Sequence, residues 1–197
     1  MPFVFKRLAL FLSIAAAFAA DKDRPFHVGP VEGYPGRQTQ AGVTVAADPY
    51  GTEEKAQTAF GKLIPYKYGI LPVLVVVKNE SPKAIRLDRL KAEYVGRNRE
   101  RVDATPARDV RYLNGPRRPA VTTGPTGAPK IGKHKNPLDA WEIEGRAFAA
   151  KMLPPGQTAS GFFYFQTGLQ RGATVYLTGL SEADTGTELF YFEVPLQ

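Results

Sequence analysis

A continuous apolar run at residues 70–79, Ile-Leu-Pro-Val-Leu-Val-Val-Val-Lys-Asn, limits the fold more than any other part of the chain. Branched apolar residues favour extended backbone, and a run without polar alternation predicts a strand that is covered on both faces. Pro72 cannot donate a ladder hydrogen bond, so we expect it near the start of this strand or at an edge position. The fold must therefore place other structure on both sides of this strand.

Shorter strand and helix signals, separated by turn residues, occupy much of the remaining chain. Residues 84–95 predict either a strand pair or a bulged strand with one solvent-exposed face. Other strands are expected at 42–47, 100–104, 146–153, 160–166, 173–178 and 188–194, the last two as a hairpin through 182–186. Short helices are expected at 52–60, with Thr52 as N-cap and Gly61 as terminator, and near 107–113, and a helical turn is expected at 137–144. This spacing predicts an all-β sandwich with one or two short helices.

The N-terminus has the pattern of a secretory signal peptide. Lys6 and Arg7 precede an uncharged, mostly apolar stretch at 8–20 that is shorter than the ~20 residues of a spanning helix. We expect residues 1–20 to be removed on export to the periplasm or beyond, with an uncleaved N-terminal anchor as the alternative. Residues 21–40, rich in Pro and Gly, are expected as an extended arm before a single domain at 41–197.

The absence of cysteine and the scarcity of histidine exclude several kinds of active site. The chain has 0 Cys and 2 His, so it can form no disulfide, thiolate zinc site or cysteine nucleophile, and a three-histidine zinc site is also excluded. After residue 20 the only serines are Ser81, Ser160 and Ser181, and none lies in a Gly-x-Ser-x-Gly motif. We therefore expect no catalytic residue, no metal and no cofactor.

Two segments carry a resemblance to a known fold. Leu153-Pro154-Pro155-Gly156 followed by Gly161-Phe-Phe-Tyr-Phe165 is similar to a strand–turn–strand pattern in secreted bacterial immunoglobulin-like domains, many of them without assigned function. The run from Gly69 into Asn79-Glu80-Ser81 resembles the strand that opens such domains. The resemblance covers about half of the chain after residue 20. It implies an immunoglobulin-like β-sandwich and supplies no catalytic residue; the Cys–Trp–Cys pattern and tyrosine corner of antibody domains are absent.

Positive charge is concentrated in the middle of the chain. Residues 84–135 carry 13 Lys and Arg against 5 Asp and Glu, whereas 136–197 carry 3 against 7. Within this region, the Gly- and Pro-rich segment 114–136 is expected to be a flexible insert. Arg97, Arg99 and Arg101 alternate, which in a strand would place all three on one face. The candidate polyanion- or partner-binding residues are Arg97, Arg99, Arg101, Arg108, Arg111, Arg117, Arg118, Lys130, Lys133 and Lys135.

Such a surface would attract anionic lipid, anionic glycan or an acidic partner protein. Export argues against a nucleic-acid target. The alternative is that the arginines lie on an exposed face and pair with Glu100, Asp103 and Asp109.

Two further groups could act at a binding or catalytic site. Glu142 and Glu144 would share a face of a strand and could form a glycosidase pair beside Trp141; the alternative is an exposed edge with Trp141 packed on the core. In the aromatic strand, Phe163 and Phe165, or Tyr164, could face outward as a docking surface, the alternative being a role in the core.

These patterns favour an exported, non-catalytic envelope protein that acts as a structural or protein-interaction module, with an envelope protein or an anionic surface as partner. The alternatives are a binding module for anionic polymer, glycan or membrane surface through residues 97–135, and a carbohydrate-active hydrolase.

Overall fold

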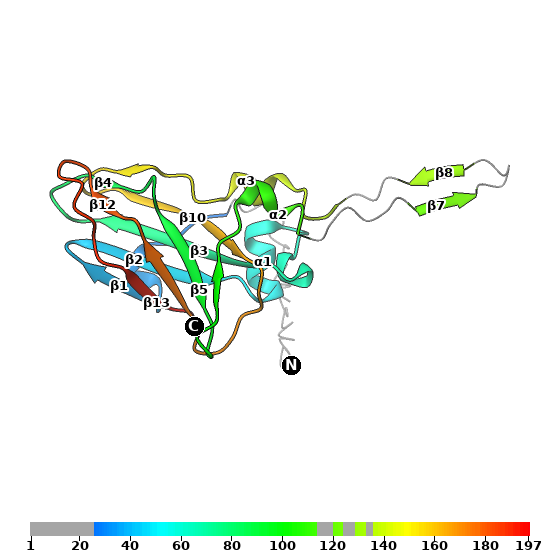
Figure 1. The fold of residues 1–197 in the computed structure, drawn as a ribbon, viewed down its shortest axis with the longest axis horizontal. Coiled ribbons are helices and arrows are strands. Elements are labelled where there is room, and N and C mark those ends of the chain that lie inside the picture. The colour runs from blue at the N-terminus through cyan, green and yellow to red at the C-terminus, as the bar shows by residue number, and fades with distance from the viewer. Residues whose placement is uncertain (1–25, 114–119, 124–128, 133–135) are drawn as a thin grey trace, which may run out of the picture.

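Two four-stranded antiparallel sheets form the body of the protein (Figure 1). The computed structural model describes residues 26–113, 120–123, 129–132 and 136–197. The first sheet has the order β1-β2-β3-β10, formed by Arg37–Gln40, Val43–Pro49, Leu71–Asn79 and Thr158–Phe165. The second has the order β13-β11-β5-β6, formed by Phe192–Pro195, Thr174–Thr178, Lys91–Val95 and Arg101–Asp103. The predicted predominance of β structure is therefore confirmed.

Two smaller antiparallel sheets complete the described strands. The strands β12 (Ser181–Glu182), β4 (Ile85–Arg86) and β9 (Met152–Leu153) form one of them. In the segment expected as a flexible insert, β7 (Ala120–Thr123) pairs with β8 (Pro129–Gly132), and the intervening and flanking residues lie outside the described ranges. The expected signal peptide also lies outside them. No helix within the described ranges is long and apolar enough to cross a membrane.

Helices cover the face of the first sheet that points away from the second sheet. They are α1 (Glu53–Phe60), α2 (Ala107–Val110) and α3 (Trp141–Gly145), with the 3-10 turns η1 (Val31–Gly33) and η2 (Pro65–Tyr68). The sequence signals for α1 are confirmed, because the Thr52 hydroxyl accepts a hydrogen bond from the Lys55 amide and Gly61 ends the helix at φ 60°. The expectation of one or two short helices was too low, since the helices build a second apolar layer.

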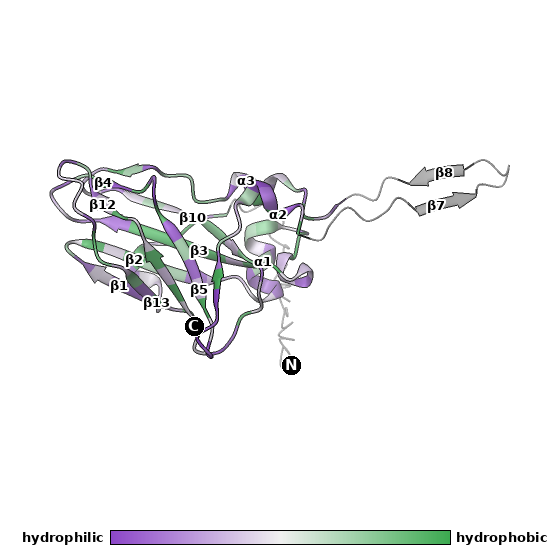
Figure 2. Cartoon of the chain, in the orientation of Figure 1, coloured by the Kyte–Doolittle hydropathy of each residue, from purple (hydrophilic) through white to green (hydrophobic). Residues whose placement is uncertain are grey.

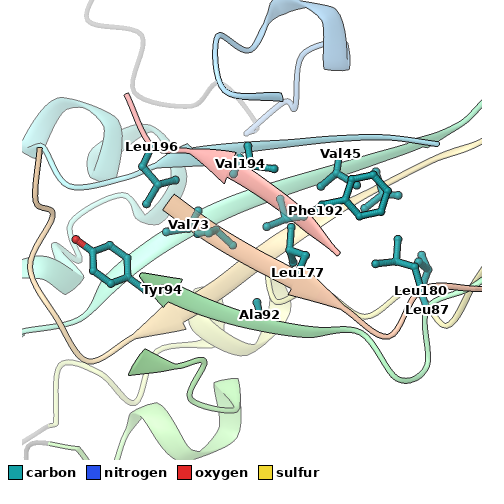
Figure 3. Packing of buried hydrophobic residues seen from close by; sticks show 14 of the residues in the cluster. Val45, Val73, Leu87, Ala92, Tyr94, Leu177, Leu180, Phe192, Val194 and Leu196 are labelled. Atoms are coloured by element: carbon teal, nitrogen blue, oxygen red, sulfur yellow. The ribbon is translucent and has the colours of Figure 1, made fainter. Parts of the chain in front are cut away.

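The central strand β3 contributes to two separate cores, as its continuous apolar sequence predicted. Its residues Val73, Val75 and Val77 pack toward the second sheet, with Tyr94, Leu177 and Phe192 opposite (Figure 3). The alternate residues Leu74 and Val76 pack toward the helices, together with buried side chains such as Phe60, Val110 and Ile143. Strand alternation explains this division, because successive side chains point to opposite faces. In Figure 2 the apolar colour accordingly follows the strands of both sheets.

Pro72 occupies the second position of β3, near the start of the strand as expected. β3 is a central strand, paired with β2 on one side and β10 on the other. The Pro72 carbonyl still accepts a hydrogen bond from the Tyr50 amide at 2.8 Å. Pro72 therefore removes one backbone hydrogen-bond donor, near the start of β3, and leaves the rest of the strand's hydrogen bonding intact.

Several boundaries differ from the sequence expectations because distant segments compete for pairing. Residues 84–95 divide into β4 and β5, which join different sheets. β11 does pair with β13, but this strand starts only at Phe192, and the connection contributes β12 to the sheet of β4. In the expected strand 146–153 only Met152–Leu153 is extended and paired as a strand, although Ala147 forms an isolated bridge to Phe162.

Contacts along both edges hold the two main sheets together. The Glu193 amide of β13 donates to Gln38 Oε1 of β1 at 2.6 Å. On the opposite edge, the chain crosses from β6 to β10, where the Thr105 amide donates to the Tyr164 carbonyl at 2.7 Å. In the expected extended arm, residues 26–36 lie against the first sheet, where Val31 is buried and the Phe26 ring lies 5.6 Å from that of Phe162. The end of the expected arm, residues 37–40, forms β1 of that sheet.

Candidate functional site

The three alternating arginines do not share one face of a strand. Arg97 and Arg99 lie in the turn between β5 and β6, and Arg101 is the first residue of β6. The turn is closed by a hydrogen bond from the Gly96 amide to the Glu100 carbonyl at 2.9 Å, and Arg99 adopts a left-handed φ of 64°. The sequence prediction was wrong because the strand ends at Val95 and the chain reverses direction.

The other basic candidates lie elsewhere in the fold. Arg108 and Arg111 are in and directly after α2, at the helical side of the molecule (Figure 1). Arg111 pairs with Asp139 at 3.0 Å and also with Glu144, and Arg108 lies 3.9 Å from Asp109. Four candidates lie outside the described ranges, namely Arg117, Arg118, Lys133 and Lys135. Lys130 belongs to β8, of which only the backbone is described.

The acidic partners of these arginines differ from those expected, except for Asp109. Arg101 pairs with Glu93 at 2.6 Å rather than with Asp103 or Glu100. The Glu100 side chain instead accepts hydrogen bonds from the Asn98 amide and from Gln170 Nε2. Arg101, Arg108 and Arg111 therefore form separate ion pairs, and Arg97 and Arg99 lie in an exposed turn. The expected continuous basic stripe is not present among the described residues.

The outer face of the second sheet carries a stacked group of aromatic and charged side chains. The Arg101 guanidinium carbon lies 5.1 Å from the centre of the Tyr176 ring, while its Nη1 donates to Glu93 Oε2 at 2.6 Å. The Tyr191 ring stacks on the Tyr176 ring at 4.8 Å with an interplanar angle of 28°. We call Glu93, Arg101, Asp103, Tyr176, Tyr191 and Glu193 the Arg101–Tyr176 surface.

Strand register places these residues beside one another. Tyr176 on β11 is opposite Glu193 on β13 and Glu93 on β5, and Glu93 is opposite Asp103 on β6. Directly opposed residues in a sheet project to the same side. Their chain neighbours Leu177, Phe192 and Val194 are buried in the core, which directs this row outward. Tyr191 is 48% exposed, and Phe190 beside it in the chain is 82% exposed.

The aromatic side chains expected to face outward are instead largely buried. Tyr164 and Phe165 are buried on opposite faces of β10, and Phe163 is partly buried and stacks on Phe148 at 5.5 Å. The docking interpretation of this strand was wrong, and the alternative of a role in the core is confirmed, because the helices cover one face and the second sheet covers the other. The sequence prediction did not place Tyr176 and Tyr191 among the outward-facing aromatic side chains, although each directly precedes an apolar core residue and alternation could have identified them.

The Arg101–Tyr176 surface has mixed charge. Its side chains include one arginine and three carboxylates, from Glu93, Asp103 and Glu193. The exposed Arg97 and Arg99 lie at the nearby turn. A surface with this mixture offers both hydrogen-bond donors and acceptors, but it has no excess of cations that would concentrate an anionic polymer.

The expected carboxylate pair is separated by its helix. Glu142 and Glu144 lie in α3, where residues two apart point in opposite directions. Glu144 pairs with Arg111, whereas Glu142 lines a cavity of about 450 Å³ with Trp141, Tyr68 and Asp139. The alternative expectation was also wrong, because Trp141 is 71% exposed rather than packed on the core.

The other side chains that could act as a nucleophile, a metal ligand or an acid have structural hydrogen bonds or lie away from one another. The Ser81 hydroxyl is hydrogen bonded to Asn79 Oδ1 and to the Lys83 carbonyl. Among the described residues, no three His, Asp or Glu side chains come together as a possible metal site. Burial raises the pKa of Tyr164 above its usual range, and its hydroxyl donates to the Ile143 carbonyl at 2.7 Å.

Comparison with known proteins identifies no family for this chain. No protein-family model matches the chain, and no curated protein matches it. Among solved structures, one from Bordetella pertussis, provisionally named ApaA, has 12% sequence identity and a TM-score of 0.36, covering 79% of this chain and 88% of its own. A structural genomics target, SoR45, has 8% identity and a TM-score of 0.35 over the same shares. At these scores neither similarity supports a functional assignment.

Proposed function

We propose that this chain is an exported, non-catalytic envelope protein whose immunoglobulin-like β-sandwich binds a partner protein through the Arg101–Tyr176 surface. The observation that carries the proposal is the stacking of Arg101 on Tyr176, and of Tyr191 on Tyr176, on a solvent-facing sheet. Tyrosine and arginine are enriched among residues that dominate binding energy at protein interfaces. Two four-stranded sheets around a common core are consistent with the immunoglobulin-like resemblance.

The geometry of this surface lowers the entropic cost of binding. Arg101 is held by Glu93 on one side and by the Tyr176 ring on the other, so its rotamer is already selected in the free protein. Side chains that are ordered before association lose less freedom when they meet a partner. The surrounding carboxylates of Asp103 and Glu193 would supply hydrogen-bond acceptors around the aromatic centre.

The cysteine-free sequence permits a direct test of this proposal. A Glu193→Cys variant would carry a single thiol on β13, within the Arg101–Tyr176 surface, to which a photoreactive maleimide can be attached. A matched Gln57→Cys variant would carry the same probe on α1, at an exposed position outside this surface. After irradiation with a bacterial envelope fraction, we expect a discrete protein adduct from Glu193→Cys only. No adduct, or the same adduct from both positions, would contradict the proposed site.

Binding of an anionic polymer is the competing function, and the charge distribution supports it less well. Arg101, Arg108 and Arg111 each lie near a carboxylate, which leaves less positive potential for a polyanion. Retention on heparin provides the test, because polyanion binding through several cations falls steeply with salt. We expect release of the chain, prepared without residues 1–20, at low salt. Strong retention that is lost in an Arg97/Arg99/Arg101→Ala variant would favour the polyanion function.

The location of the protein can be tested separately. The signal-like segment at 1–20 supports export with removal of this segment. The mass of the chain recovered from the periplasm of an expressing bacterium should then correspond to a start at Asp21. Recovery of the full-length chain from the membrane fraction would instead support an uncleaved anchor.

A further inference from the structure

We propose that the cavity beside Trp141 is a binding site for an uncharged pyranose oligosaccharide. This inference is independent of the Arg101–Tyr176 surface, because the cavity lies at the helical side of the first sheet. It has a volume of about 450 Å³ and is lined from three segments, including Lys62 and Tyr68 near η2 and Asp139, Trp141 and Glu142 around α3. This size falls within the roughly 300–1,000 Å³ of typical small-molecule sites.

Trp141 presents an exposed aromatic surface that packs against its own helix. Its side chain is 71% exposed, although the large side chain of tryptophan is on average mostly buried in folded proteins. A methyl group at Gly145 would lie 3.0 Å from Trp141 Cε3 and 3.2 Å from Cζ3, so the indole lies directly against the helix backbone at this glycine. The Arg146 guanidinium carbon lies 5.9 Å from the centre of the ring. These contacts support the indole while most of its surface stays accessible.

The polar groups around this ring match a ligand rich in hydroxyl groups. The carboxylates of Glu142 and Asp139 are hydrogen-bond acceptors, and the Lys62 ammonium is a donor. The negative face of an aromatic ring attracts the weakly positive C–H groups on the face of a pyranose. An aromatic wall with a few converging polar groups is the arrangement of sites that orient a small polar ligand.

The charge balance of the lining favours an uncharged ligand over an acidic one. Two carboxylates and one lysine line the cavity, and Asp139 is already paired with Arg111 at 3.0 Å. The geometry also favours binding without hydrolysis, since Glu144, the second acid of the expected glycosidase pair, is engaged by Arg111. An anionic oligosaccharide would meet the carboxylate of Glu142, which forms no ion pair with any of the described residues, at close range.

The single tryptophan of the chain is its own reporter for this site. We would titrate the chain without residues 1–20 with chitotetraose and with cellotetraose while recording tryptophan fluorescence, and with a heparin tetrasaccharide for comparison. We expect a saturable change with at least one uncharged sugar and none with the heparin fragment. No saturable change with either uncharged sugar, or a larger change with the heparin fragment, would overturn the proposal.

Variants separate this site from a general effect of folding. Tyr68→Ala retains the reporter and should weaken sugar binding about tenfold, and Glu142→Gln should weaken it several-fold. Tyr112→Ala removes another exposed aromatic side chain that does not line the cavity, so it should bind as the parent does. Thermal unfolding midpoints should agree among the three variants within a few degrees. Equal affinity of all three for the sugar would overturn the assignment to this cavity.

Discussion

The Arg101 guanidinium on β6 lies 5.1 Å from the centre of the Tyr176 ring on β11, although β5 runs between these two strands. The arginine reaches across β5 because Glu93 on that strand binds its Nη1 at 2.6 Å. One carboxylate thus positions a cation over an aromatic ring on an exposed sheet. This three-strand arrangement forms the centre of the proposed partner-binding surface.

Replacement of Arg101 should affect partner binding more than stability. Its side chain is 57% exposed, and exposed ion pairs contribute about 0.2–1 kcal/mol. We expect Arg101→Ala to lower the free energy of unfolding by less than about 1 kcal/mol and to reduce the Glu193→Cys adduct about tenfold. Arg101→Lys keeps the charge but loses the planar stack, so it should also reduce the adduct. Arg108→Ala is the control and should change neither quantity.

Asn79 should be essential for stability. Its side chain is fully buried; Nδ2 donates to the Lys83 and Leu153 carbonyls, and Oδ1 accepts from the Ser81 amide and hydroxyl. Asn79→Ala would leave these groups without partners, so we expect a loss of about 2–4 kcal/mol in urea unfolding. Asn98→Ala, in the exposed turn after β5, should lose less than about 1 kcal/mol. A loss of less than about 1 kcal/mol for Asn79→Ala would contradict this prediction, because it would show that water satisfies the hydrogen-bonding groups that Asn79 otherwise pairs.

Gly161 should not tolerate even a methyl group. A Cβ at this position of β10 would lie 2.3 Å from Phe148 Cα and 2.5 Å from Phe148 N, because residues 146–148 run directly alongside the strand. Gly161→Ala must push these backbones apart and break the Phe148–Phe162 hydrogen bond, so we expect a loss of about 2 kcal/mol or more in thermal or urea unfolding. Gly168→Ala, where the added methyl meets no neighbour, is the matched control.

Acid should weaken the contact between the β12 turn and the segment before β4. A hydrogen bond from Lys83, and secondarily one from Thr185, holds the pKa of Glu182 below its usual 4.5. A lowered pKa in the folded state means that this contribution is present above the unfolded pKa and is lost as pH falls through the folded one. The difference in urea midpoint between the parent and Glu182→Gln should therefore shrink as pH falls from about 6 to about 3. A difference that stays constant over this pH range would contradict the role of Glu182.

Local sequence signals identified the elements that depend on local chemistry. The strand β3 was evident because its two buried faces require an uninterrupted apolar run, and α1 because Thr52 and Gly61 provide a cap at each end. The turn at Gly156 and the Asn79-Glu80-Ser81 motif were also visible, and the structure explains the motif through the hydrogen bonds of Asn79.

Features that depend on long-range pairing could not be read in the same way. The basic residues seemed continuous in sequence, but the reversal of the chain at Arg99 and the start of α2 distribute them over two regions. The helical turn expected at 137–144 is present as α3, but the exposure of Trp141 depends on its packing against Gly145, which the sequence did not indicate. The Arg101–Tyr176 contact joins residues 75 positions apart, so only the register of β5, β6 and β11 brings them together.

A competition experiment tests partner binding at the Arg101–Tyr176 surface most directly. The Glu193→Cys probe would be irradiated with the envelope fraction in the presence of excess unlabelled chain. We predict that the unlabelled parent and a Tyr112→Ala variant abolish the adduct, whereas Tyr176→Ala leaves it in place. Equal competition by all three chains would contradict the proposal that Tyr176 and Arg101 form the partner-binding site.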